Sequence, residues 1–267
     1  MSEELSTLIC SPSPRDIKQV SDSVNAIKGV PKLWAKYYHE ADAYRIMERY
    51  FLEHTNADYL VICPDDLVAR DEDYRAILKT INDHGGKEQF PMISGICNLH
   101  NMPGYRTQLA ICIDQEIHPN RRRRHYTWMD MRHQDWKEKG YDKTELLRVK
   151  FSGFGLQFVR RDIVERFGLQ GDKAFNDFDK RQQDLSYDVM LCYVCNQNDI
   201  PIYVNPQVWM LHLRGSHPKE VEGIEPLLVG VKEAKVLYVD GEGKEIDITQ
   251  LCEQYVPQKP IIREKKA

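Results

Sequence analysis

The sequence lacks the long apolar run that a membrane-spanning helix needs. No stretch of its 267 residues approaches the roughly 18 uninterrupted apolar residues of such a helix. The first residues also lack the cations that open a signal peptide, because Glu3 and Glu4 stand there instead. We therefore expect a cytoplasmic protein, and a peripheral contact with a membrane surface stays open.

Regularly spaced cysteines and an excess of positive charge are also missing. The seven cysteines are scattered through apolar runs, unlike a disulfide framework, so we expect reduced, buried thiols. Cys192 and Cys195 form a C-x-x-C pair, but no second pair lies at zinc-ribbon spacing. The formal net charge of -4 argues against a general nucleic-acid binder.

What the sequence does contain, in its first 63 residues, is an alternation of strand and helix patterns. The expected elements are strands at 5–10, 32–38 and 57–63 and helices at 15–27 and 44–54. Ser11-Pro12-Ser13-Pro14 should end the first strand in a loop. This alternation is typical of a parallel sheet covered by helices, whose chemistry lies at the carboxyl ends of its strands. Asp65 and Asp66 directly follow the third strand.

The rest of the chain continues the mixed pattern less regularly. The expected elements are helices at 74–83, 160–167 and 185–195 and strands at 91–97, 107–114, 202–204 and 208–212. We expect 91–97 and 107–114 to form a hairpin-like addition to the sheet. Residues 119–150 carry ten Lys or Arg against five Asp or Glu and predict a long excursion. We expect a domain over 1–220 and an appendage over 221–267, with a hairpin that turns at Asp240-Gly241.

Acidic and imidazole residues fall at several expected element ends: Asp65, Asp66, Asp184 and His212. Two adjacent carboxylates are costly to hold together unless a cation neutralises them, which favours a divalent metal. The structural alternative is that Asp65-Asp66 caps the next helix, Asp184 caps its own helix, and His212 is a structural histidine.

The order of several segments resembles the GT-A glycosyltransferases, the nucleotide-sugar-dependent enzymes related to the large inverting synthase family. After a first strand that ends in a proline-rich loop come YLVICPDDLV, FSGFGLQFVRRDIVERFG, QQDLSYDVMLC and IYVNPQVWMLHL. The resemblance covers roughly residues 5 to 215. It implies a Rossmann-like GT-A fold of the α/β class, with a mixed, mostly parallel central sheet flanked by helices and a small C-terminal β-hairpin appendage.

The resemblance also implies a donor and metal site. The Asp-x-Asp signature of the family falls on Pro64-Asp65-Asp66, so proline replaces its first aspartate. Asp66 is then expected to bind Mn²⁺ or Mg²⁺ together with His212, while Asp65 faces the donor ribose or the metal through water.

Further residues are expected to bind the donor. By the same resemblance, Ser11, Pro12 and Arg15 meet the nucleotide. Arg45 or Arg49 could reach the phosphates, or either could belong to a solvated helix face.

The acceptor and the general base are assigned in the same way. Gly153-Phe154-Gly155 matches the acceptor loop of the family, and its Glu-Asp signature falls on Gln183-Asp184. The aspartate of that signature is the catalytic base of inverting members, so the resemblance implies this role for Asp184. Asp188, one helical turn later, is the alternative base.

Four consecutive arginines, Arg121 to Arg124, stand in the basic excursion. In the resembled fold this stretch borders the acceptor cleft, which implies that Arg121 and Arg122 contact an anionic or membrane-held acceptor. A nucleic-acid contact or a solvated loop are the alternatives.

The activity implied is metal-dependent transfer of a sugar from a nucleotide-diphosphate sugar to a hydroxyl of a glycan, a lipid-linked acceptor or a protein. A non-catalytic GT-A-fold protein that binds a carbohydrate or a partner is a second possibility. A nucleotidyltransferase is a third, but such an enzyme needs a glycine-rich phosphate loop after the first strand, and 11–15 has no glycine.

Overall fold

The expected strand and helix alternation forms at the start of the chain. The structure, a computed structural model, describes residues 5–97, 111–112, 145–169, 187–213 and 233–256. The first elements are β1 (Thr7–Ser13), α1 (Lys18–Ala26), β2 (Lys32–Lys36), α2 (Glu40–His54) and β3 (Tyr59–Ile62). β1 pairs in parallel with both β2 and β3, and β1 and β3 are buried throughout. The three strands therefore end at the same edge of the sheet, as the sequence predicts.

The remaining elements complete the sheet and its helical layers. They are β4 (Leu67–Val68), α3 (Asp71–Asp83), η1 (Lys87–Gln89), β5 (Met92–Cys97), β6 (Ile111–Cys112), β7 (Leu147–Val149), β8 (Phe151–Ser152), β9 (Gln157–Arg160), α5 (Arg161–Phe167), α6 (Tyr187–Gln197), β10 (Ile202–His212), β11 (Lys235–Val239), β12 (Glu245–Asp247), α7 (Thr249–Cys252) and η4 (Glu253–Tyr255). The main sheet runs β12-β11-β2-β1-β3-β9-β5-β10-β4, and β7 pairs with β10. Among the described residues no helix has the length and apolar composition needed to cross a bilayer.

The sheet is mixed, but its antiparallel share is larger than the first 63 residues suggest. β9 lies between β3 and β5 and runs antiparallel to both. The C-terminal hairpin of β11 and β12 forms as expected, and β11 pairs antiparallel with β2. The hairpin therefore extends the central sheet. Parallel pairing joins β1 to β2, β1 to β3 and β5 to β10 within the described strands.

Two local predictions were wrong. The described β5 pairs with β9 and β10, whereas β6 pairs with β8 in a separate small sheet, so among the described residues 91–97 does not pair with 111–112 of the expected second strand. β1 also continues through Pro12 to Ser13 instead of ending in a loop. Pairing with β3 ends where Cys63 donates to the carbonyl of Cys10, so on that side Pro12 has no ladder bond to lose.

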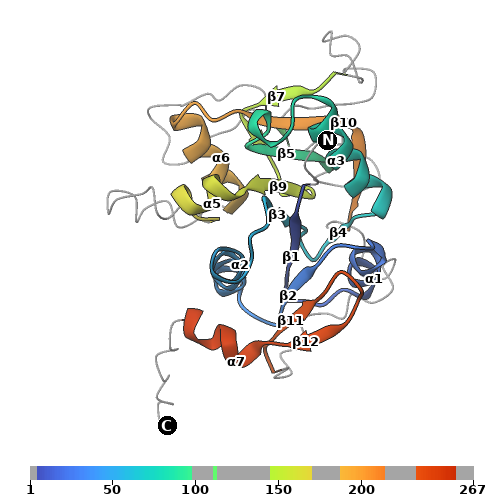
Figure 1. The fold of residues 1–267 in the computed structure, drawn as a ribbon, viewed down its shortest axis with the longest axis vertical. Coiled ribbons are helices and arrows are strands. Elements are labelled where there is room, and N and C mark those ends of the chain that lie inside the picture. Colours follow the sequence, from blue (N-terminus) through green and yellow to red (C-terminus); the bar gives the residue numbers. More distant parts are fainter. Residues whose placement is uncertain (1–4, 98–110, 113–144, 170–186, 214–232, 257–267) are drawn as a thin grey trace, which may run out of the picture.

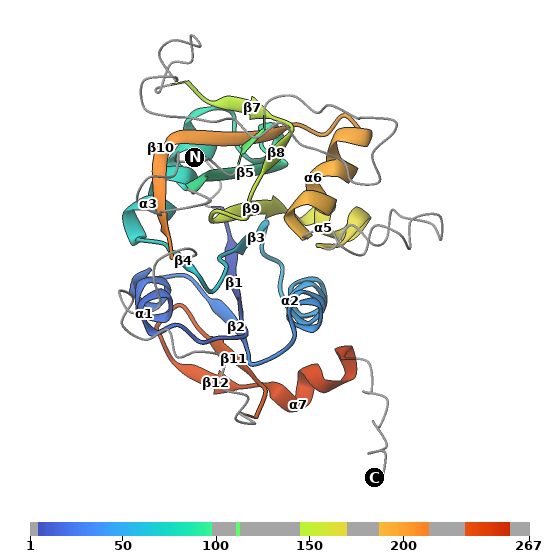
Figure 2. The same ribbon diagram turned by 180° about the vertical axis from the view of Figure 1, so that it is seen from behind.

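Helices cover both faces of the sheet and bury separate apolar clusters (Figures 1 and 2). α2, α5, α6 and α7 pack on one face, where Phe51, Phe167 and Leu191 are among the buried side chains. α1 and α3 pack on the other face through residues such as Val24 and Ile77. Because side chains alternate across each strand, β1 contributes to both clusters, with Leu8 on one face and Ile9 on the other.

The cysteines whose burial the structure describes are free thiols inside these clusters, as expected. Cys192 lies against the carbonyl of Ser152, and Cys195 lies 3.3 Å from the sulfur of Met92. Burial raises the pKa of Cys195 to about 12, so its thiol stays protonated. The C-x-x-C pair is therefore part of the core.

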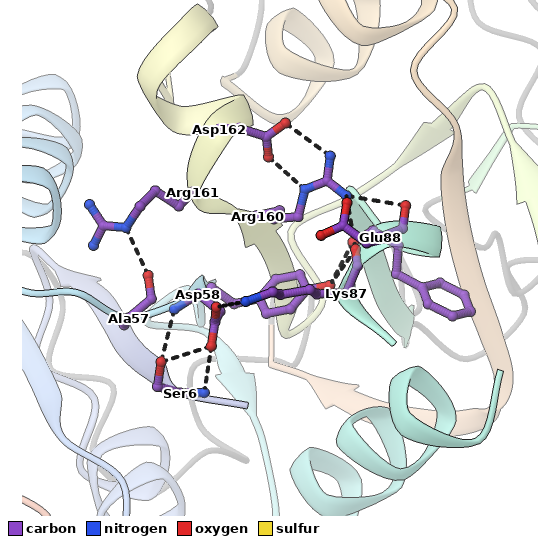
Figure 3. A network of polar contacts seen from close by, with 10 residues as sticks. Ser6, Ala57, Asp58, Lys87, Glu88, Arg160, Arg161 and Asp162 are labelled. Carbon is purple, nitrogen blue, oxygen red and sulfur yellow. Dashed lines mark hydrogen bonds and ion pairs between the residues drawn. The ribbon is translucent and has the colours of Figure 1, made fainter. Parts of the chain in front are cut away.

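The amino ends of the central strands are joined by a polar network (Figure 3). The carboxylate of Asp58 accepts hydrogen bonds from Ser6 and from Lys87 Nζ, which lies 2.6 Å away. Arg160, at the end of β9, donates to the carbonyl of Lys87 and pairs with Asp162. These contacts connect the starts of β1 and β3 to η1 and α5.

Arg161 connects this edge to α2. Its guanidinium donates to the backbone carbonyls of Phe51, Thr55 and Ala57 at 2.9 to 3.1 Å and lies 4.3 Å from the ring centre of Phe51. One side chain thereby bonds the carbonyl of Phe51 in the last turn of α2 and the carbonyls of Thr55 and Ala57 in the segment that follows the helix.

We predict that Arg161→Ala lowers the free energy of unfolding by about 2 kcal/mol, because three carbonyls lose a charged donor and Phe51 loses a stacked cation. Urea denaturation measures the change. Arg166→Ala on the same helix is the matched control, since Arg166 also lies over a ring, that of Phe167 at 4.6 Å, but donates to the exposed Asn198 side chain instead of to backbone carbonyls. Its expected effect is within about 0.5 kcal/mol, and equal losses in the two variants would contradict the assignment.

Candidate functional site

The candidate site lies at the carboxyl ends of β1 and β3, next to the end of β10. Asp65 and Asp66 follow β3, and the short β4 then pairs antiparallel with the last residues of β10. In this register His212 lies opposite Leu67, and the backbone N–H of Leu213 donates to the carbonyl of Asp66 at 2.7 Å. The backbone thus brings His212 next to Asp66, which lies 146 positions earlier in the sequence.

Arg15 holds the acidic pair from the other side. Its backbone N–H and its Nε each donate to Asp65 Oδ2 at 3.0 Å, and its Nη2 contacts Asp65 Oδ1. The same Nη2 lies 2.9 Å from Asp66 Oδ2. One guanidinium therefore neutralises part of the charge of two nearly buried carboxylates, whose residues are 5% and 9% exposed.

Asp66 lies between two cationic or potentially cationic groups. Its Oδ1 is 3.4 Å from His212 Nε2, while its Oδ2 faces Arg15. Burial by itself would raise the pKa of Asp66, but the hydrogen bonds and charges of His212 and Arg15 outweigh it and hold the pKa well below its usual range. Asp66 is therefore a carboxylate at any neutral pH.

Asp66 and His212 fit a divalent metal. Two ligands of one ion, each about 2.1 to 2.3 Å from it, lie about 3 Å apart, which is close to the 3.4 Å between Asp66 Oδ1 and His212 Nε2. Carboxylate and imidazole are both suitable donors for Mn²⁺. No group of three or more His, Cys, Asp or Glu side chains gathers in this way among the residues the structure describes. Asp66 and His212 would therefore supply only part of a coordination shell.

Two buried hydroxyl groups at the end of β1 have no hydrogen-bond partner within the described residues. Ser11 and Ser13 lie on either side of Pro12 at the end of β1, and each residue is 1% exposed. Within the described part of the chain nothing bonds to the Oγ of either residue. An unsatisfied buried hydroxyl costs about 1 to 3 kcal/mol, so such a pair indicates a place that a water molecule or a ligand completes.

Backbone strain lies in the same region. Asp16 and Tyr37 have φ angles of 50° and 62°, in the left-handed region that non-glycine residues rarely adopt. The Tyr37 hydroxyl and Lys36 Nζ each lie 2.9 Å from the carboxylate of Asp16, which ties the end of β2 to the loop after β1. Strained backbone of this kind is concentrated at functional sites. Sequence reasoning missed both residues, because neither type signals a positive φ.

Two further acidic residues, Glu40 at the start of α2 and Asp188 in the first turn of α6, lie close enough to the acidic pair to interact electrostatically with it or with each other. Desolvation and the charges of Asp188, Asp65 and Asp66 raise the pKa of Glu40, the first residue of α2. Ring contacts join the two helix starts, since Tyr44 lies 4.8 Å from Tyr187 between ring centres. The charges of Asp188, the alternative base, and of the acidic pair therefore act on the same carboxyl group, that of Glu40. Sequence reasoning missed Glu40, whose only signal was an acid at a helix start facing this edge.

The remaining predicted site residues have different outcomes. Gly153, Phe154 and Gly155 are buried. Phe154 contacts Tyr44 at 5.8 Å between ring centres, and a Cβ at Gly155 would meet Met210 Cε at 3.2 Å. Gly155 therefore allows close packing of the chain on itself, and the acceptor contact of all three residues stays a prediction.

Two predicted arginines on α2 pair within their own helix instead of joining the site. Arg45 and Arg49 pair along their own helix with Asp42 and Glu53, each at 3.4 Å. This geometry favours the solvated helix face over a phosphate contact. Asp184, Arg121 and Arg122 lie outside the described residues.

Comparison with known protein families and with curated proteins finds no match. Among solved structures, the chain is similar to the one titled "Crystal Structure of A197 from STIV", with a TM-score of 0.42 and 13% sequence identity. The similarity covers 91% of this chain and 94% of that chain. The function is therefore argued from the residues of the site.

We predict that Asp66→Asn lowers the free energy of unfolding at pH 7 by about 2 kcal/mol, because Arg15 loses a carboxylate partner. The folded-state pKa of Asp66 is lowered, so the stabilisation is fully present above the unfolded-state pKa of about 4. It is lost as the pH falls from there towards the folded-state pKa.

Urea denaturation of both proteins between pH 7 and pH 3 measures this effect, and the difference between them should shrink below about pH 4. Asp22→Asn is the control, since Asp22 pairs with Lys18 on an exposed helix face. A difference that stays constant over the whole range would contradict the linkage to Asp66.

Proposed function

We propose that the protein is a glycosyltransferase of the GT-A kind that moves a sugar from a nucleotide-diphosphate sugar to an acceptor hydroxyl. The observation that carries the proposal is the position of Asp66, between Arg15 and His212 at the carboxyl ends of β1 and β3. A carboxylate and an imidazole with metal-ligand spacing, next to an arginine, suit a ligand that carries phosphates.

The charge of the site supports a metal-dependent reaction. The charges of Asp188, Asp65 and Asp66 act on Glu40, and Arg15 is a permanently charged partner of Asp65 and Asp66. An anionic diphosphate would be repelled by this excess of carboxylates. A Mn²⁺ or Mg²⁺ ion held by Asp66 and His212 would stabilise the charge that develops on the leaving diphosphate.

The end of β1 is the proposed place of the nucleotide. The unpartnered hydroxyls of Ser11 and Ser13 offer hydrogen bonds there, and the guanidinium of Arg15 is a bidentate donor suited to phosphate oxygens. Pro12 lies between the two serines. These residues support the donor site that the resemblance implies.

The reaction needs a base for the acceptor hydroxyl. The acceptor oxygen attacks the anomeric carbon on the face opposite the diphosphate, and the bond from that carbon to the diphosphate breaks. A carboxylate takes the proton of the acceptor hydroxyl. Attack from the opposite face inverts the configuration of the anomeric carbon. Asp184 keeps this role by resemblance. Asp188 is supported by its position in the first turn of α6 and by its interaction with Glu40. The acceptor itself, whether a glycan, a lipid-linked molecule or a protein, is proposed only as a hydroxyl-bearing molecule.

A non-catalytic sugar-binding protein is the second candidate. It is favoured by one observation, that Arg15 already bonds both oxygens of Asp65. Hydrolysis of nucleotide sugars in the presence of Mn²⁺ separates the two candidates, because only an enzyme releases the nucleoside diphosphate.

We predict that Mn²⁺ together with the matching nucleoside diphosphate raises the melting temperature of the wild-type protein, because a ligand that binds only the folded state stabilises it. A thermal-shift panel of nucleoside diphosphates and their sugars, with and without Mn²⁺, measures the effect. Asp66→Ala should abolish the metal-dependent part, whereas Asp22→Ala should preserve it. A metal-dependent shift that is unchanged in Asp66→Ala would refute the metal assignment, and no shift with any member of the panel would refute the donor site.

We further predict that either Asp184→Asn or Asp188→Asn reduces sugar transfer by about two or more orders of magnitude and keeps donor binding, the usual scale for a general base. Our first expectation is Asp184. Transfer rates at saturating donor, with donor affinity measured in parallel, separate the two residues. Wild-type rates in Asp184→Asn with a large loss in Asp188→Asn would move the base to Asp188, and wild-type rates in both would remove the base from this helix start.

A further inference from the structure

The guanidinium of Arg15 occupies the acidic pair that the proposed metal would also use. Nη2 reaches Asp65 Oδ1 and lies 2.9 Å from Asp66 Oδ2, so one nitrogen bridges the two carboxylates. Nε adds a further bond to Asp65 at 3.0 Å. His212 contacts the remaining oxygen of Asp66. A divalent ion between Asp66 and His212 would therefore be separated from the guanidinium by a single carboxylate group.

The three side chains differ in their freedom to move. The side chain of Arg15 is 30% exposed, whereas those of Asp65 and Asp66 are 7% and 13% exposed. Asp66 is fixed by the backbone bond from Leu213 and by the pairing of β4 with β10. Asp65 would keep its bond from the backbone N–H of Arg15 even if the guanidinium left. Arg15 is thus the member of the cluster that can withdraw without dismantling it.

Two cations that share one carboxylate repel each other, and the repulsion is large where the surroundings are partly buried. A divalent ion at Asp66 would either displace the guanidinium or be repelled by it, and both effects weaken the binding of the ion. Phosphate oxygens are the other acceptors that an arginine binds in a bidentate way, so an arriving diphosphate gives Arg15 a second partner.

We propose that Arg15 is an internal counter-ion that competes with the divalent metal for Asp66 and keeps the affinity of the site for the metal alone low. The inference rests on the metal site of the proposed function. It assigns to Arg15 a role that is separate from contact with the nucleotide, and this role is measurable without any sugar transfer.

The test is calorimetric titration of Mn²⁺ alone into the full chain. Arg15→Gln should bind Mn²⁺ at least about tenfold more tightly than the wild-type protein, a typical size for coupling between two bound groups. Arg15→Met, which keeps an unbranched apolar stem but removes the charge and the hydrogen-bond donors, should show the same increase. Arg49→Gln is the matched control, because it removes an equal charge from an exposed pair on α2 and should leave the affinity within about twofold.

The double variant Arg15→Gln, Asp66→Ala tests whether the gain passes through Asp66, and it should lose the increase. Circular dichroism and thermal unfolding show whether each variant is folded, and the folded member of the Arg15→Gln and Arg15→Met pair decides the outcome. Mn²⁺ affinity that is equal or weaker without the guanidinium overturns the competition and leaves the metal site intact. No Mn²⁺ binding in the wild-type protein or in either Arg15 variant overturns both the competition and the metal part of the proposed function.

Discussion

Two adjacent buried carboxylates need a cation, and this constraint organises the carboxyl edge of the sheet. Asp65 and Asp66 are held by Arg15 from the loop after β1 and by His212 from the end of β10. Without these partners, burial would push the pKa of Asp66 upward and favour its neutral form. Through Asp66 the cluster connects the loop after β1 to the end of β10, roughly two hundred positions further along the sequence. These polar contacts therefore also help to hold the two strand ends at one edge of the sheet.

The regular part of the fold could be predicted because local pattern and burial agree there. The continuous apolar run that becomes β3 and the helical spacing of Ile17, Val20 and Val24 needed no distant information, and both formed. The neighbours of β5 and β9 could not be predicted, since strand pairing is decided between segments that are far apart in sequence. The continuation of β1 through Pro12 depended on where its pairing with β3 stops, which the local sequence does not encode.

The position of Asp65, Asp66 and His212 at strand ends was predictable, because residue type and an apolar run before it carry that signal, while their role in binding stays a prediction. It was less predictable where the geometry depends on the backbone. The positive φ angles of Asp16 and Tyr37 and the unpartnered hydroxyl of Ser13 have no mark in the sequence. The link between Glu40 and Asp188 arises because α2 and α6 both begin near this edge, a result of packing rather than of any motif.

The two edges of the sheet use arginine in opposite ways. At the amino edge Arg161 and Arg160 donate to backbone carbonyls, and Arg160 also pairs with Asp162. These two arginines therefore stabilise the fold. At the carboxyl edge Arg15 bonds two carboxylates, one of which, Asp66, also faces the imidazole of His212. The end of β1 at this edge carries two buried hydroxyls with no partner among the described residues. The positive φ angles of Asp16 and Tyr37 and the incomplete hydrogen bonding of the serines cost energy, which the buried clusters on both faces offset. The carboxyl edge therefore differs from the amino edge in the way its arginine is used, because Arg15 bonds side chains that a ligand could also bind, whereas Arg161 bonds backbone carbonyls of the scaffold.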